Sequence, residues 1–176
     1  MPFRPEEAPG RDRTPEEGAR LEERLPLVGV LDNLRSAFNV GSIFRTSEAA
    51  HLAGLRLCGI TPYPPNVKLD RTSLGTTYRV PWKHHVETGE AIRELRSDGY
   101  AIWAVEVSPQ AVSLRDVEVP RPLALIFGHE VAGIGAVASR EAERTVRIPL
   151  YGRKNSLNVA TAYGVGVFEV LRRWGH

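Results

Sequence analysis

The stretch IPLYGRKNSLNVA, which runs from Ile148 to Ala160, says the most about the fold of this chain. A β-branched run ends at Pro149, a loop of Gly, Lys and Asn follows, and Ser156 and Asn158 stand where an apolar helix begins. A loop that leads from the carboxyl end of a strand to a helix N-terminus is where α/β proteins bind ligands. The hydroxyl of Ser156 and the amide of Asn158 are therefore candidate ligand contacts. Helix capping is the alternative for both, because Ser and Asn are favoured N-cap residues.

Length and composition indicate one globular domain that does not span a membrane. The 176 residues are enough to bury a core, and a hydrophobic fraction of 42% is typical of soluble proteins. No apolar run approaches the roughly 20 residues of a membrane span. The single cysteine, Cys58, lies in an apolar run, which excludes an internal disulfide and predicts a buried, inert thiol. Together these features predict a cytoplasmic protein.

The chain divides into a polar leader and a domain. Residues 1–24 are charged, contain prolines and lack the apolar segment of a signal peptide. We expect them to be partly disordered, with a short helix that starts at Thr14 and ends near Glu23. Residues 25–176 form the predicted domain.

Within the domain, strands alternate with helices. The predicted strands cover residues 27–31, 55–60, 82–87, 101–107, 123–127 and 144–148. The predicted helices cover residues 39–50, 157–174 and a segment capped by Thr88 and ended by Gly99, with a helical turn at 72–78. This alternation predicts an α/β fold with a mainly parallel sheet and helices on both faces. The run 123–127 is apolar throughout, which predicts a central strand.

The net charge of +2 does not by itself indicate nucleic acid, but local charge is informative. Eight basic residues fall at predicted loops or element ends: Arg35, Arg45, Lys68, Arg71, Arg79, Lys83, Arg153 and Lys154. They are either an ordinary solvated surface or a patch that binds phosphates.

A second polar segment follows the first strand and contains Asn39 and Arg45. Asn39 is placed to cap the helix, and Arg45, six residues on, lies less than two turns from the same end. An arginine there can hold a phosphate or carboxylate with two parallel hydrogen bonds. An ordinary surface arginine is the alternative. The apolar neighbours Ile43 and Phe44 instead favour a partly buried guanidinium that needs a partner.

A third polar segment, FGHE, follows the central strand. Gly128 lets backbone approach a ligand closely, and Glu130 is an acid at the carboxyl edge of the sheet. We interpret His129 as a structural histidine, because no HxxxH or Cys/His spacing supports a metal site. Gly133 and Gly135 resemble a dinucleotide fingerprint only in part, since its third glycine is missing. All three polar segments follow strands, so they can converge at one sheet edge.

In this order, the three segments resemble the motifs of the SpoU/TrmH family of RNA ribose 2′-O-methyltransferases, in the SPOUT superfamily. The resemblance covers residues 27–174. It implies a C-terminal segment threaded as a trefoil knot, an exception to the rule that folds are unknotted. It also implies S-adenosyl-L-methionine bound in the knot, tRNA or rRNA as substrate, and a homodimer whose active site draws on both subunits.

The resemblance also implies roles for individual residues, and no metal. The catalytic residues it implies are Asn39, Arg45, Glu130, Ser156 and Asn158. The cofactor-binding residues it implies are Val105, Gly128, Ile148, Ser156 and Leu157. The family view makes the arginine a general base. Free guanidinium groups have a pKa above about 12, so we rank Arg45 first as a phosphate clamp that orients the hydroxyl. His129 departs from the small or amide residue that such proteins commonly carry.

Two other functions remain as alternatives: a non-catalytic RNA-binding protein that retains the fold, and a nucleotide-dependent oxidoreductase, for which the glycine fingerprint and its acidic partner are missing.

The last helix bears on the predicted homodimer. Its apolar and small residues spread around much of the circumference: Val159, Ala160, Tyr163, Gly164, Val167, Phe168, Val170 and Leu171. The small pair Ala160 and Gly164 would let a partner helix approach closely. The alternative is a helix buried inside its own subunit.

Overall fold

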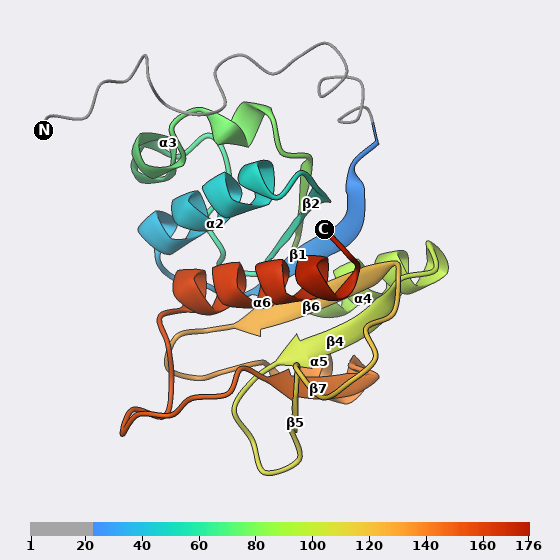
Figure 1. Cartoon of the computed structure of the whole chain (residues 1–176). Helices are drawn as coiled ribbons and strands as arrows, with labels where there is room; N and C mark the ends of the chain where they lie inside the picture. Colours follow the sequence, from blue (N-terminus) through green and yellow to red (C-terminus); the bar gives the residue numbers. More distant parts are fainter. Residues whose placement is uncertain (1–22) are drawn as a thin grey trace, which may run out of the picture.

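The structure, a computed structural model, describes residues 23–176 as an α/β domain built on one seven-stranded sheet (Figure 1). The strands are β1 (Leu25–Asp32), β2 (Leu52–Cys58), β3 (Trp82–His85), β4 (Ala101–Val105), β5 (Val112–Ser113), β6 (Leu123–Gly128) and β7 (Arg144–Arg147). The helices are α2 (Ala37–Ala49), α3 (Val67–Ser73), the 3-10 helix η2 (Thr76–Tyr78), α4 (Thr88–Ser97), α5 (Ala136–Glu141) and α6 (Val159–Arg173). The predicted leader helix that begins at Thr14 lies outside the described residues.

The sheet has the order β3-β2-β1-β6-β4-β7-β5, and its paired strands run parallel. The predicted parallel sheet is confirmed, and β6 is central as expected. In β6, Leu125 and Phe127 pack into the core on one face, while Ala124 and Ile126 pack into the core on the other. A strand buried on both faces has no polar position, which explains its continuous apolar sequence.

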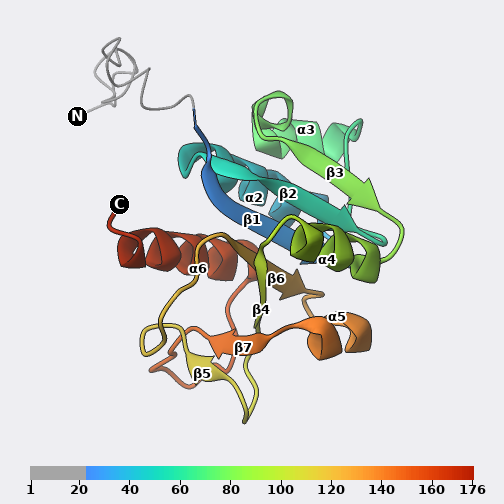
Figure 2. The same cartoon turned by 90° about the vertical axis from the view of Figure 1, so that its right-hand side faces the viewer.

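Helices cover both faces of the sheet, as predicted. Helices α2, α3 and α6 pack together on one face, and α4 and α5 lie on the opposite face (Figures 1 and 2). None of the helices in the part of the chain described is long and apolar enough to cross a membrane. Cys58 is fully buried as expected, and burial raises the pKa of its thiol to about 12.

Several predicted boundaries were wrong. Helix α2 is capped by Ser36, whose hydroxyl accepts from the N–H of Asn39, so Asn39 lies inside the helix. Thr88 is the first residue of α4 and donates its hydroxyl to Asp32; Glu87 holds the cap position. Helix α3 begins before the predicted turn at 72–78. Elements β5 and α5 were not predicted at all, because two and six residues are too short for a periodic signal.

Helix α6 buries one side within its own chain. Val159, Tyr163, Val167, Val170 and Leu171 are buried against the sheet and α2. A Cβ at Gly164 would make only an ordinary contact within the chain, 3.9 Å from Cγ2 of Thr46. Val165 and Phe168 remain exposed on the opposite side of the helix.

The carboxyl ends of the central strands meet at one edge. Asp32 at the end of β1 pairs with Gly128 at the end of β6, and Val105 at the end of β4 pairs with Val146 in β7. The segments that follow these strands therefore start side by side, as the parallel topology predicts.

Candidate active site

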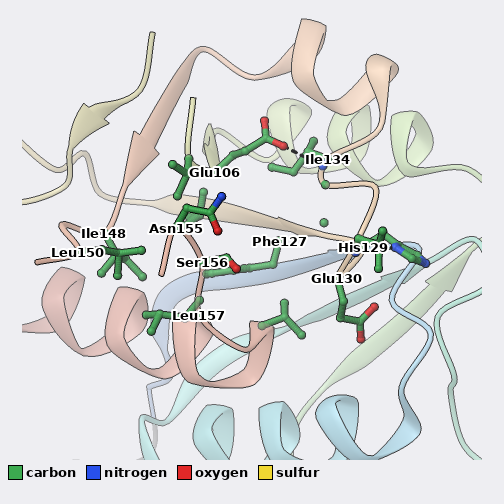
Figure 3. Close-up of a pocket in the computed structure, with 17 residues that line it drawn as sticks. Glu106, Phe127, His129, Glu130, Ile134, Ile148, Leu150, Asn155, Ser156 and Leu157 are labelled. Atoms are coloured by element: carbon green, nitrogen blue, oxygen red, sulfur yellow. Dashed lines mark hydrogen bonds between the residues drawn. The ribbon is translucent and has the colours of Figure 1, made fainter. Parts of the chain in front are cut away.

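A cavity of about 370 Å³ opens at this edge of the sheet (Figure 3). Its walls come from the ends of β4 and β6, the loop between β6 and α5, and the segment between β7 and α6. The residues that line it are Val105, Glu106, Val107, Phe127, Gly128, His129, Glu130, Val131, Gly133, Ile134, Ile148, Leu150, Asn155, Ser156, Leu157, Val159 and Ala162. A volume in this range is typical of small-molecule and cofactor sites.

All five residues proposed for cofactor binding lie on this cavity: Val105, Gly128, Ile148, Ser156 and Leu157. They come together because β4 lies between β6 and β7, so that three strand ends and one long loop face the same space. Of the proposed catalytic residues, Glu130 and Ser156 also line the cavity. Asn39, Arg45 and Asn158 do not.

The loop after β6 folds back tightly on the strand. His129 and Gly133 exchange both backbone hydrogen bonds at 2.9 Å, and a Cβ on Gly128 would lie 2.4 Å from the Gly133 backbone. Gly133 has a φ of +72°, a conformation that favours glycine. Nδ1 of His129 accepts the N–H groups of Val131 and Ala132. These contacts agree with the interpretation of His129 as a structural histidine, and the residue also lines the cavity.

Beside the cavity, a chain of hydrogen bonds joins three segments. Nδ2 of Asn39 donates to Oε1 of Glu130 at 3.0 Å, and Nδ2 of Asn158 donates to Oδ1 of Asn39 at 3.2 Å. Oε2 of Glu130 accepts the N–H of Arg35 at 3.4 Å. Burial raises the pKa of Glu130, but hydrogen bonds from its own N–H, from Asn39 and from Arg35 outweigh burial and lower it overall. Glu130 is thus held as a carboxylate.

Helix capping, the alternative role for both Asn158 and Ser156, applies to Asn158 only. Oδ1 of Asn158 accepts the N–H groups of Ala160 and Thr161, so Asn158 is the N-cap of α6. Its side chain caps the helix with one end and holds Asn39 with the other. Ser156 makes no hydrogen bond with any residue in 23–176 and lies on the cavity wall, so capping does not apply to it.

Arg45 lies on α2, about 9 Å along the helix axis from Asn39. The expectation of a partly buried guanidinium with a partner was wrong. Arg45 is exposed and, among residues 23–176, has no hydrogen bond or ion pair. Its apolar neighbours Ile43 and Phe44 turn to the core, which leaves the arginine on the outer side of the helix. Its guanidinium is free to meet a ligand from solution.

Sequence reasoning missed Glu106, which lines the cavity just past the end of β4. Its Oε1 accepts the N–H of Ile134 at 3.2 Å (Figure 3). The predicted strand ran to residue 107, so Glu106 was counted as a strand position and not as a strand-end residue. Among the described residues, Glu106 and Glu130 are the two carboxylates of the lining, and no Lys or Arg is part of it.

Asp32 was also missed as a support for this site. The side chain is buried, and its Oδ2 accepts the N–H of Gly135 at 2.7 Å. Oδ1 accepts from Thr88 at 2.5 Å and from Asn33 at 2.9 Å. The carboxylate therefore ties the end of β1 to the far end of the cavity loop. A polar residue at the end of an apolar strand was the available signal.

The structure sorts the eight basic residues into two groups. Lys83 pairs with Glu94, and Arg79 lies 3.8 Å from Glu48. The side chains of the other six make no hydrogen bond or ion pair within the described part of the chain, and they are exposed: Arg35, Arg45, Lys68, Arg71, Arg153 and Lys154. Nor does any cluster of three His, Cys, Asp or Glu residues in 23–176 have the arrangement of a metal site.

Solved structures resemble this fold and site. An AdoMet-bound rRNA methyltransferase from Sinorhizobium meliloti superposes with a TM-score of 0.77 at 33% identity, over 83% of this chain and 56% of that one. The SpoU methyltransferase AviRb from Streptomyces viridochromogenes, in complex with AdoMet, gives a TM-score of 0.78 at 26% identity, over 89% and 64%.

Proteins of similar sequence are also named as methyltransferases. A tRNA (guanosine(18)-2′-O)-methyltransferase of Thermus thermophilus is 30% identical over 168 residues, or 93% of this chain and 86% of the relative. A TrmH-family protein of Staphylococcus haemolyticus, named as a tRNA/rRNA methyltransferase, is 31% identical over 156 residues. The chain spans 61% of the length of this second relative. The model of the SpoU rRNA Methylase family matches residues 26–168. The chain therefore belongs to the SpoU rRNA methylase family.

Proposed function

We propose that this protein transfers a methyl group from S-adenosyl-L-methionine to a ribose 2′-hydroxyl of tRNA or rRNA. One observation carries the proposal: a cavity lined by Val105, Gly128, Ile148, Ser156 and Leu157 lies directly beside the hydrogen-bonded unit of Glu130, Asn39 and Asn158. The named activities of the Thermus relative and the AdoMet-bound Sinorhizobium structure support it.

The lining of the cavity fits this methyl donor. Within residues 23–176, two carboxylates and no Lys or Arg line the space, which disfavours the phosphates of a dinucleotide and favours a ligand with positive charge. S-Adenosylmethionine carries a positive sulfonium and, when bound, supplies an electrophilic methyl group. Apolar side chains of Ile148 and Leu157 and the backbone at Gly128 offer surface for the rest of the molecule. The same charge argument counts against an oxidoreductase.

The residues beside the cavity would position the RNA. Because Glu130 and Asn158 hold both ends of its amide, Asn39 keeps one orientation and can serve as a fixed hydrogen-bonding group for the ribose. Arg45 is free of protein partners, and its planar guanidinium suits a backbone phosphate. Alignment of this kind can lower a barrier by up to ~7–11 kcal/mol in favourable cases. Ser156 would shape the donor loop.

The unpaired basic residues support RNA as the substrate. Arg35 precedes α2 beside Glu130, and Arg153 and Lys154 lie in the loop that enters the cavity wall. Lys68 and Arg71 lie on α3, which packs across α2. Exposed cations without protein partners can neutralise phosphates, and binding through them weakens as salt rises.

A trefoil knot and a homodimer belong to the same proposal. In the sheet, β4 lies between β6 and β7. After β7 the chain returns past β4, so that α6 packs against β6 and α2. This path supports a threaded C-terminus. For the dimer, Val165 and Phe168 are 45% and 52% exposed and line a second groove of about 280 Å³ with Ile148 and Pro149. Large exposed apolar side chains that gather in this way are typical of protein interfaces. We assign the protein to the cytoplasm, where the Cys58 thiol stays reduced.

Methyl transfer to RNA tests the proposal. Total RNA incubated with the protein and labelled S-adenosylmethionine should gain label, and mapping should place it on 2′-hydroxyl groups. Calorimetry with a chelator present should show that the donor binds without metal. Donor binding and RNA binding without transfer would favour the non-catalytic alternative. If folded protein binds no donor at millimolar concentration, the methyltransferase proposal fails.

A further inference from the structure

Glu106 occupies a fixed position directly after the carboxyl end of β4. Its N–H donates to the carbonyl of Val146 at 2.9 Å, which anchors the backbone, and Oε1 accepts the N–H of Ile134 at 3.2 Å. A Cβ on Gly133 would lie 2.4 Å from this same oxygen, so the carboxylate packs directly on the loop backbone. The side chain is thus held at both ends, half-buried on the cavity wall.

The negative charge of Glu106 is not neutralised by its surroundings. Oε2 of Glu106 has no hydrogen bond with any described residue, and no Lys or Arg lines the cavity. The other carboxylate of the lining, Glu130, has both oxygens occupied by Asn39 and Arg35. Of the two, Glu106 therefore has the oxygen that remains available to a ligand.

A charge in this position acts on whatever fills the cavity. A space of about 370 Å³ is small enough that charged groups of a bound ligand lie within several ångströms of its walls. At such distances one unit charge changes affinity for an opposite charge by about tenfold or more, even at the screening typical of protein surfaces. The effect is largest for a ligand whose positive charge lies beside Oε2 of Glu106.

We propose that Glu106 makes the site favour the positively charged donor, S-adenosylmethionine, over the neutral product, S-adenosylhomocysteine. This inference rests on the function proposed above. When the methyl carbon leaves sulfur for the ribose oxygen, the bonding electrons stay on sulfur, its positive charge disappears and the hydroxyl proton passes to solvent. The attraction exerted by Glu106 falls at that moment, so product leaves more readily than donor.

Three ligands and three proteins test this inference by calorimetry. The ligands are S-adenosylmethionine, S-adenosylhomocysteine and sinefungin, whose amine keeps a positive charge in place of the sulfonium. The proteins are the wild type, Glu106→Gln and Glu143→Gln. Glutamine at 106 can still accept the N–H of Ile134. Glu143 is the matched control, because its Oε1 also accepts a backbone N–H at 3.2 Å, from Ile102, but it does not line the cavity.

Glu106→Gln should lower the affinity for S-adenosylmethionine and for sinefungin by about tenfold. It should leave the affinity for S-adenosylhomocysteine within about twofold of the wild-type value. Glu143→Gln should leave all three affinities near the wild-type values. Equal losses for donor and product in Glu106→Gln, as expected if the carboxylate binds ribose hydroxyls, would overturn the inference, and so would no loss at all. In either case wild-type binding of the donor leaves the proposed function intact, whereas wild-type protein that binds neither ligand contradicts the function itself.

Discussion

Nδ2 of Asn158 donates a hydrogen bond of 3.2 Å to Oδ1 of Asn39, although the two residues are 119 positions apart in the chain. The bond joins the N-cap of α6 to the first turns of α2. It also orients the Asn39 amide, because with Oδ1 occupied the Nδ2 group faces Glu130. The three side chains therefore form one unit, and a change in one alters the position of the others.

Two substitutions of Asn158 separate its two roles. Asn158→Asp keeps the oxygen that caps α6 but loses the N–H donor to Asn39, so we expect near wild-type stability and strongly reduced methyl transfer. Asn158→Ala removes the cap as well and should also lower the free energy of unfolding by about 1 kcal/mol. Urea denaturation and a methyl-transfer assay measure the two effects.

Asn66 supplies the control for both substitutions, because it caps α3 in the same way and lies outside the site. Asn66→Ala should lower the free energy of unfolding by a similar amount, and Asn66→Asp should retain methyl-transfer activity. If Asn158→Asp transfers methyl groups at the wild-type rate, the bond to Asn39 has no catalytic role.

Arg45→Ala should abolish methyl transfer and leave both stability and donor affinity nearly unchanged. The side chain is exposed and has no partner within residues 23–176, so its removal disturbs no packing. Arg45→Lys should restore little activity, because an ammonium group cannot replace a planar pair of donors. Arg93→Ala, an exposed arginine on α4 at the opposite face of the sheet, is the control. Substantial turnover by Arg45→Ala would contradict the assignment.

The contribution of Glu130 to stability should depend on pH. Its folded-state pKa lies below the ordinary value of 4.5, so the folded protein favours the carboxylate. The stabilisation is then fully present above pH 4.5 and is lost as the pH falls through the lowered folded-state pKa. Urea denaturation across pH 3–7 should show wild type and Glu130→Gln differing at neutral pH and converging in acid. Exposed Glu118, substituted by Gln, is the control. A difference that grows in acid would reverse the predicted sign.

Gly29→Ala should destabilise the domain by about 1–3 kcal/mol. The added methyl group would lie 2.7 Å from the ring and hydroxyl of Tyr163 and 2.8 Å from Cδ2 of Leu55. Tyr163 cannot give way easily, because it is fully buried and its hydroxyl lies 2.7 Å from that of Ser47. Gly152→Ala has no atom within 4 Å of the new group and should change the denaturation midpoint little. Equal midpoints for the two variants would show that the core relaxes around residue 29.

Phe168→Asp should convert the proposed homodimer into a monomer. The ring is 52% exposed on α6 and lines the groove with Val165 and Pro149, so a charge there would oppose association. Light scattering should give twice 19.5 kDa for the wild type and 19.5 kDa for the variant. Val86→Asp, at a position that is 75% exposed near β3, should remain dimeric. A monomeric wild type at micromolar concentration would contradict the dimer and a site shared between subunits.

Local sequence patterns were enough to predict the class of fold and the edge of the sheet at which the candidate site lies. Buried positions are apolar, so burial can be recognised in a short stretch of sequence. The apolar run at 123–127 predicted a strand covered on both faces, and β6 has a neighbouring strand on each side. Polar residues that follow such strand ends, as at Glu130 and Ser156, indicated the edge at which the cavity lies. Short elements such as α5 left no pattern to read.

The partners of the polar side chains could not be predicted, because they depend on long-range packing. Asn39 fits the N-cap rule by residue type, yet Ser36 caps the helix and Asn39 bridges Glu130 and Asn158. Arg45 was expected to have a partner and is exposed without one among the described residues. A hydrogen bond has a range of about 3 Å, whereas the segments that meet here are far apart in the chain. Which polar atoms come within that range depends on the order of the strands in the sheet and on the direction in which each helix returns.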